Sequence, residues 1–282
     1  MADVMDFDMD DLDQDVMEGW GSDEVEGGAS VEEEDFLEGM EPSKKSMTIF
    51  FLIDTSASMG GTKIGTVNAT MEELLPELIG LGGTETDISI AAMRYDSEVS
   101  WITPEPMRVE EYQMWPRQSA TGMTAMGAAF EELNRKLSRS SFMNKPSLSF
   151  APVIFLMSDG APNDDWRKGL ALLKKNSWYK YGLKIAVGIG SAPNMDVLRE
   201  FTGDPNLAIQ AHGAAELKRL IKFLAVTSSQ IGSKSMSLTD DGHELTADDV
   251  AGSKQEQLKE AVVDLMGTEF PDADHMDFEQ GW

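Results

Sequence analysis

The 282-residue chain has no cysteine, only three histidines, and no apolar run long enough for a transmembrane helix, which takes about 20 residues. The absence of cysteine excludes disulfides, thiol catalysis and thiolate metal sites. The N-terminus also lacks the basic stretch followed by an apolar stretch that is typical of secretory signal peptides. We therefore expect a soluble, cytoplasmic protein.

Basic residues are scarce at both ends of the chain. Residues 1–42 hold 17 acidic residues and no lysine or arginine, and residues 233–282 hold 13 acidic residues against three lysines. The net charge of −27 is therefore carried by the ends, around a middle with 20 residues of each sign. A neutral middle argues against nucleic-acid binding, and acidic ends are repelled by anionic lipid. They favour a basic protein partner, or only solubility.

Charge and hydropathy divide the chain into three parts. Residues 1–44 are too acidic to form a core and are predicted to be disordered, although Phe7, Trp20 and Phe36 leave open a segment that folds on binding. Residues 45–232 form the predicted domain. The acidic residues 233–282 contain a short amphipathic helix at about 253–266, with Ser253 and Glu256 as its capping box, which docks on the domain or on a partner.

Apolar runs alternate with amphipathic stretches across the middle. Strands are predicted at 48–53, 87–96, 98–102, 151–158, 183–190 and 207–210. Helices are predicted at about 64–80, 125–139, 165–178, 194–201 and 214–226, with Pro76 expected to kink or restart the first. The pattern indicates an α/β fold, a doubly wound and mostly parallel sheet with helices on both faces. The very short turn after residue 96 makes the strand at 98–102 an antiparallel edge strand.

The first apolar run ends at Asp54, which Ser56 and Ser58 follow at alternate positions before the turn at Gly60-Gly61. Carboxylate and hydroxyl oxygens at the carboxyl end of a buried strand suit a small hard cation such as Mg²⁺ or Mn²⁺. Ligands of open α/β sheets also bind at that edge. By itself the spacing fits a serine-rich turn equally well.

Other segments deliver polar groups to the same edge. The run at 151–158 ends at Asp159, and the loop at 119–127 supplies Thr121 and Thr124 ahead of a helix, where capping is their default role. The charged pair Arg94 and Asp96 at another strand end is expected to be solvated.

A strand ending in D-x-S-x-S, a threonine loop before a helix and a later strand ending in S-D-G-x-P together resemble the von Willebrand factor A domain and its metal-ion-dependent adhesion site (MIDAS). The resemblance covers about residues 46–232. It implies that the ligands of Mg²⁺ or Mn²⁺ are Asp54, Ser56, Ser58, Thr124 and Asp159. Because the second loop reads Gly-Met-Thr where the family commonly has Gly-Gly-Thr, Thr121 stays an alternative to Thr124. The segments IFFLIDTSASM, SATGMTAMGAAF and IFLMSDGAPND look most like the bacterial TerY-like branch, associated with tellurium resistance and stress responses.

The resemblance implies a non-catalytic, metal-dependent protein-binding scaffold whose ion is completed by an Asp or Glu of a protein partner. One of the acidic ends occupying that position at rest is a further hypothesis. The alternative is an accessory subunit of an ATPase assembly of the MoxR or chelatase type. An aspartyl-nucleophile hydrolase is disfavoured because its D-x-D-x-T pattern needs an acid where Ser56 stands, and a secreted adhesin because signal peptide and disulfides are missing.

Overall fold

The computed structural model describes residues 44–79, 81, 86–234 and 246–269. All described residues belong to one compact unit, Pro42–Trp282. Apart from Lys44, the acidic segment predicted at 1–44 lies outside the described residues.

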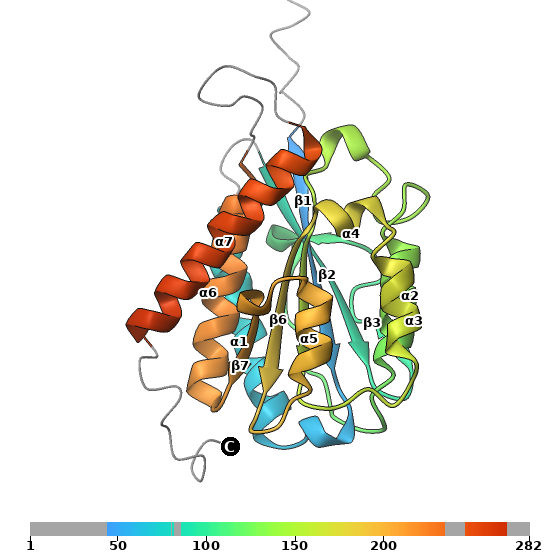
Figure 1. Cartoon of the computed structure of the whole chain (residues 1–282), viewed down its shortest axis with the longest axis vertical. Coiled ribbons are helices and arrows are strands. Elements are labelled where there is room, and N and C mark those ends of the chain that lie inside the picture. The colour runs from blue at the N-terminus through green and yellow to red at the C-terminus, as the bar shows by residue number, and fades with distance from the viewer. Residues whose placement is uncertain (1–43, 80, 82–85, 235–245, 270–282) are drawn as a thin grey trace, which may run out of the picture. The chain divides into compact units, whose positions relative to one another are not determined.

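Seven strands form one mostly parallel sheet in the order β3-β2-β1-β5-β6-β7, with β4 also paired to β2 (Figure 1). The pairs that involve β1, β5, β6 and β7 are all parallel, whereas β3 and β4 run antiparallel to β2. This confirms the predicted fold class. The strands are β1 (Lys45–Asp54), β2 (Thr86–Tyr95), β3 (Val99–Trp101), β4 (Met107–Arg108), β5 (Val153–Ser158), β6 (Leu183–Ile189) and β7 (Ala208–Ala211).

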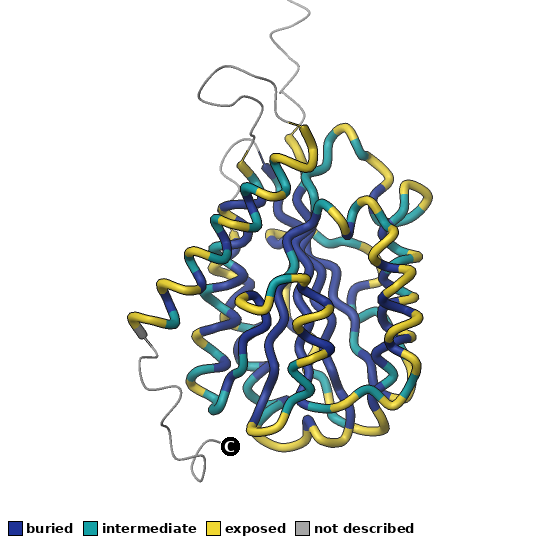
Figure 2. Tube along the Cα trace, viewed as in Figure 1, coloured by how far each residue is buried: buried dark blue, intermediate teal, exposed yellow. Residues whose placement is uncertain are grey.

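The central strand β1 is buried along most of its length, as the dark blue centre of Figure 2 shows. Its alternating side chains enter two separate cores, one on each face of the sheet. Ile49, Phe51 and Ile53 pack with helices on one face, and Phe50 and Leu52 with helices on the other. The first face is covered by α1 (Thr62–Leu78), α6 (Ala214–Gly232) and α7 (Ala247–Glu269). The second is covered by α2 (Met126–Lys136), α3 (Trp166–Leu173), α4 (Ser177–Tyr181) and α5 (Met195–Thr202). Burial on both faces holds the carboxyl end of β1, and so Asp54, in a fixed position.

Several elements differ from the predicted ones. The helix expected at 165–178 is two helices, because the side chain of Asn176 accepts a hydrogen bond from the backbone N–H of Trp178 (2.9 Å) and so caps α4. Helix α1 runs through Pro76 without restarting. The stretch between the strand predicted at 98–102 and the helix predicted at 125–139 contributes β4, for which no strand was predicted, and α6 continues to Gly232.

The C-terminal helix α7 is longer than predicted, and its cap is another pair. Thr246 and Asp249 form the reciprocal contacts: the Asp249 carboxylate accepts from the Thr246 backbone N–H (3.0 Å), and the Thr246 hydroxyl accepts from the Asp249 N–H (3.2 Å). The capping box predicted at Ser253 is therefore wrong, since that residue lies inside the helix. Leu258 and Val262 of α7 are buried in the core with α1 and α6. None of the described helices has the length and apolarity needed to cross a membrane.

Candidate metal centre

The loop after β1 is shaped by the carboxylate of Asp54, which ends the strand and is fully buried. One oxygen, Oδ1, accepts a hydrogen bond from the backbone N–H of Ser56 (2.8 Å). The other, Oδ2, accepts from the hydroxyl of Ser158 (2.6 Å), the last residue of the neighbouring strand β5. The side chain that ends β1 thus folds its own loop back and joins it to β5.

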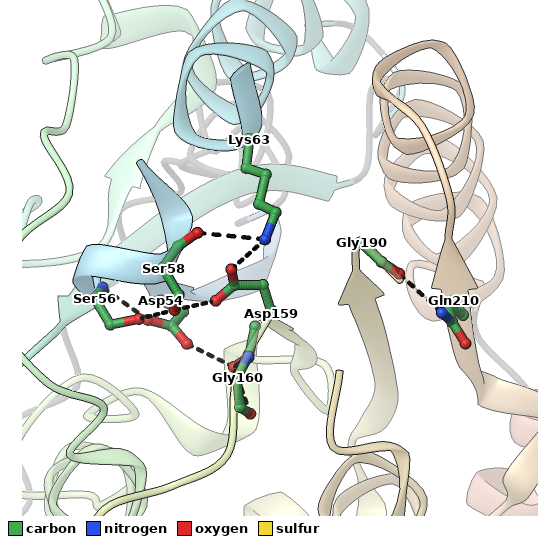
Figure 3. Close-up of polar contacts among 9 residues, drawn as sticks. Asp54, Ser56, Ser58, Lys63, Asp159, Gly160, Gly190 and Gln210 are labelled. Atoms are coloured by element: carbon green, nitrogen blue, oxygen red, sulfur yellow. Dashed lines mark hydrogen bonds and ion pairs between the residues drawn. The ribbon is translucent and has the colours of Figure 1, made fainter. Parts of the chain in front are cut away.

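The loop after β5 meets this first loop through Asp159. Its Oδ1 accepts a hydrogen bond from the hydroxyl of Ser58 (2.7 Å), whose oxygen lies 3.1 Å from the hydroxyl oxygen of Ser56 (Figure 3). Asp159 and Ser58 are 101 positions apart in the sequence and meet because β1 and β5 are adjacent parallel strands. The structure therefore brings Asp54, Ser56, Ser58 and Asp159 together at one end of the sheet.

The hydroxyl of Thr124 lies at the same place. A Cβ atom on Gly160 would be 3.5 Å from Ser58 Oγ and 3.7 Å from Thr124 Oγ1, so both hydroxyls face this glycine. Asn163 binds both backbone groups of Thr124: Asn163 Oδ1 accepts from Thr124 N (2.8 Å), and Asn163 N donates to Thr124 O (3.0 Å). Thr121, the alternative, is exposed, and its backbone N–H donates to Thr55 O (2.7 Å). Thr124 rather than Thr121 thus joins the cluster.

The end of β2 holds the first and second loops in place, a role that the sequence analysis missed. Asp96 was expected to be solvated but is only 6% exposed. Its carboxylate accepts from Arg94 (2.8 Å) and from the Glu98 N–H (3.0 Å), and its carbonyl accepts from the Ala125 N–H (2.7 Å) just after Thr124. The sequence does contain a signal for this role, because Asp96 is an acid at the end of a predicted strand, as are Asp54 and Asp159.

Asp164 and Asp165, in the loop after β5, have different roles. Either acid could cap the helix that follows, and Asp165 is the one that caps it, α3, by accepting from Lys168 N (3.3 Å). The two carboxylate oxygens of Asp164 accept instead from the backbone N–H groups of Gly127 and Ala128 (2.9 Å each), at the start of α2. The loop after β5, the third loop of the cluster, therefore fixes both Thr124 in the second loop and the start of α2.

The cluster carries two carboxylates and one nearby cation. Burial raises the pKa of Asp54, and the charge of Asp159 raises it further, while the hydrogen bonds from Ser158 and Ser56 oppose the shift. The ammonium group of Lys63, in the first turn of α1, lies 2.6 Å from Asp159 Oδ2 and 3.3 Å from the carbonyl oxygen of Ser58. The sequence does not indicate this contact, because nothing in the local pattern around Lys63 separates it from a solvated helix residue.

These donors fit a small hard cation. Apart from Lys63, the side chains that converge here offer oxygen, the ligand atom that a hard cation prefers. The part of the chain that the structure describes has no group of three or more His, Cys, Asp or Glu that could hold a metal ion, so the hydroxyls would have to complete the ligand set of the two carboxylates. The bare Cα of Gly160 leaves room beside the hydroxyls of Ser58 and Thr124. A buried carboxylate whose pKa is raised is also stabilised in its charged form by a cation.

Comparisons with known proteins agree with this architecture. A solved von Willebrand factor type A structure from Catenulispora acidiphila is 20% identical with a TM-score of 0.51, and the match covers 67% of this chain and 43% of that one. Proximal thread matrix protein 1 of the mussel byssus, in a structure described as having a zinc-occupied MIDAS motif, is 16% identical with a TM-score of 0.50, covering 66% and 50%. The chain thus spans half or less of these two structures, and the likeness concerns the fold.

A search of curated proteins gave no match. The model of one family, the von Willebrand factor type A domain, matches residues 48–222, which include all three loops of the cluster. Asp54 at the end of β1, Thr124 before α2 and Asp159 after β5 all lie in this matched range. The chain belongs to the von Willebrand factor type A domain family.

Proposed function

We propose that the chain is a metal-dependent protein-binding module. Asp54, Ser56, Ser58, Thr124 and Asp159 would hold Mg²⁺ or Mn²⁺, directly or through water, and the bound ion would supply a coordination position for a carboxylate of a protein partner. The observation that carries the proposal is the hydrogen-bonded cluster of these oxygens, which three loops deliver to one end of the sheet.

The donor set supports a partner carboxylate as the missing ligand. Mg²⁺ requires near-octahedral coordination by oxygen and keeps several water ligands unless the protein replaces them. Two carboxylates and three hydroxyls leave such an ion short of one strong ligand. The mussel protein with its zinc-occupied MIDAS motif supports a metal site on this fold. Binding to the partner would then require both the ion and one Asp or Glu of that partner.

We propose that the module is not an enzyme. The Asp54 carboxylate accepts hydrogen bonds from the Ser158 hydroxyl and the Ser56 backbone N–H, and a serine stands where a phosphatase of the aspartyl type places its second acid. This arrangement favours holding an ion over proton transfer.

The resemblance of three segments to the TerY-like branch supports a cytoplasmic bacterial stress-response or signalling assembly as the setting. The presence of kinase, phosphatase or tellurium-resistance genes beside this one would test that setting.

Isothermal titration calorimetry with Mg²⁺ and Mn²⁺ tests the site. Asp54→Ala combined with Asp159→Ala is expected to abolish binding, because no carboxylate remains, while circular dichroism shows the fold retained. Asp196→Ala is the matched control, since this acid of α5 is 91% exposed and lies outside the cluster. Unchanged metal binding in the double variant would show that the ion binds outside this cluster.

A capture experiment tests the partner. Proteins that the immobilised chain retains with Mg²⁺ are expected to be released by EDTA and not to be retained by the double variant. Replacing single acidic residues of the identified partner by their amides should then remove binding at one position. A partner that binds equally in EDTA would contradict the proposal.

A further inference from the structure

Lys63 places a positive charge beside the proposed metal centre. Its Nζ is 2.6 Å from Asp159 Oδ2 and 3.3 Å from the carbonyl oxygen of Ser58 (Figure 3). The other oxygen of Asp159, Oδ1, accepts from the hydroxyl of Ser58. Both oxygens of this carboxylate are therefore engaged within the protein.

We propose that Lys63 is an internal competitor of the divalent cation: it holds Asp159 in the metal-free protein, and metal binding displaces its ammonium group. The inference rests on the proposed function and adds what sets the affinity of that site. The two charged partners differ in their freedom to move. The Asp159 side chain is fully buried, whereas that of Lys63 is 24% exposed. The lysine can therefore turn into solvent while the carboxylate stays in place.

The place of Lys63 in α1 shows that the ammonium is held by the cluster and not by its helix. Lys63 is the second residue of α1, and that helix has no acidic residue in its first turn. The N-terminus of a helix is the positive end of its dipole, so a cation there is unfavourable. The contacts with Asp159 and the Ser58 carbonyl offset this cost. The ammonium group of Lys63 therefore acts as the counter-ion of the cluster.

Charge repulsion gives the competition its direction. An ion that takes Asp159 as a ligand would lie within a few ångströms of the ammonium group, and two positive charges at that distance in a partly buried site repel strongly. Metal binding and the Lys63–Asp159 ion pair therefore exclude each other. The pair stabilises the metal-free protein and weakens its affinity for metal. The site therefore needs a higher concentration of free divalent cation to be occupied than it would without Lys63.

The variant Lys63→Met of the full chain separates this role from a purely structural one. In EDTA its melting temperature is expected to fall by about 2–4 °C, because the buried Asp159 loses its partner. Calorimetric titration with Mn²⁺ or Mg²⁺ is expected to give a Kd about tenfold lower than in the wild type, since the competing charge is gone. Lower stability without metal together with tighter metal binding is the signature of competition.

Two controls accompany it. Lys63→Arg keeps the charge and should keep the wild-type affinity. Lys218→Met removes one lysine that is paired with Glu73 (2.7 Å) in an exposed ion pair between α6 and α1, and should leave the Kd unchanged.

Three results would overturn the inference. A higher or unchanged Kd in Lys63→Met would show that Lys63 prepares Asp159 for metal or has no effect. An unchanged melting temperature in EDTA would show that the ion pair does not stabilise the metal-free protein. If neither the wild type nor Lys63→Met binds a divalent cation, the proposed function fails together with the competition. Metal binding that appears only in Lys63→Met would support the competition, with Lys63 excluding the ion from the native chain.

Discussion

At the scale of single residues, Asp54 combines a role in the local fold with an electrostatic cost. Its carboxylate organises the first loop through Ser56 and joins it to Ser158, yet burial raises its pKa above the ordinary value of 3.8. The folded, metal-free protein therefore binds the proton of Asp54 more tightly than the unfolded chain does. Its contribution to stability is present at pH below 3.8 and is lost as the pH rises through the raised pKa.

Asp54→Asn should therefore stabilise the protein in EDTA at pH 7, with a melting temperature about 2–4 °C above that of the wild type. The asparagine keeps the shape and removes the buried charge. The difference should shrink as the pH is lowered through the raised pKa of Asp54, because the wild-type carboxyl group then becomes protonated. Mg²⁺ should raise the melting temperature of the wild type only. A less stable variant at pH 7 would contradict the assigned cost.

At the scale of elements, the second loop and α2 are held by the third loop more than by their own sequence. The residue before α2, Ala125, makes no side-chain cap, and two N–H groups in the first turn of that helix instead donate to Asp164 from the loop after β5. Asn163 from the same loop holds Thr124. The position of Thr124 in the cluster thus depends on a segment almost 40 residues away.

The neighbouring acids Asp164 and Asp165 provide a matched comparison of this dependence. Asp164→Ala removes two hydrogen bonds to the start of α2 and is expected to lower the free energy of unfolding by about 1–2 kcal/mol. Asp165→Ala removes one longer bond to α3 and should cost about 0.5–1 kcal/mol. Urea denaturation measures both, and metal titration should show weaker binding for Asp164→Ala only. Equal effects on both quantities would show that the second loop orders itself.

At the scale of the whole molecule, the folded unit extends beyond the range that matches the family. The match ends at residue 222, within α6, whereas α7 begins at Ala247 and buries Leu258, Val262 and Leu265 in the core that it shares with α1 and α6. Lys254 of α7 adds a buried hydrogen bond to the carbonyl oxygen of Gly232 (2.7 Å), and burial lowers its pKa to about 8. Helix α7 is thus part of the domain core.

Truncation tests the limits of this unit. Removing residues 1–41 should leave the melting temperature within about 2 °C, because the core described here lies entirely in the unit Pro42–Trp282. Removing residues 246–282 should lower it by more than about 5 °C, since three buried apolar side chains of α7 leave the core. The point variants Leu258→Ala, destabilising, and Val263→Ala, nearly neutral at 52% exposure, show whether packing is the cause. An unaffected melting temperature without α7 would mean that the helix is only loosely docked.

Much of the fold followed from local patterns. Continuous apolar runs that end at Asp54 and at Asp159 predicted buried parallel strands, and the structure has β1 and β5 there as neighbours. Boundaries were predicted less well where one side chain decided them. Asn176 divided a predicted single helix into α3 and α4, and Thr246 with Asp249 began α7 before the predicted capping box.

The sequence by itself determined that two carboxylates and several hydroxyls end up at one edge of a parallel sheet, because strand hydropathy and the alternation of strands with helices are local properties. Only the tertiary structure decided which groups hold that edge together: Lys63 against Asp159, Asn163 against Thr124, and Asp164 against the start of α2. Each of these contacts joins segments that follow different strands. Their partners are fixed by which strands become neighbours and how closely the loops approach, and no spacing along the chain records that distance.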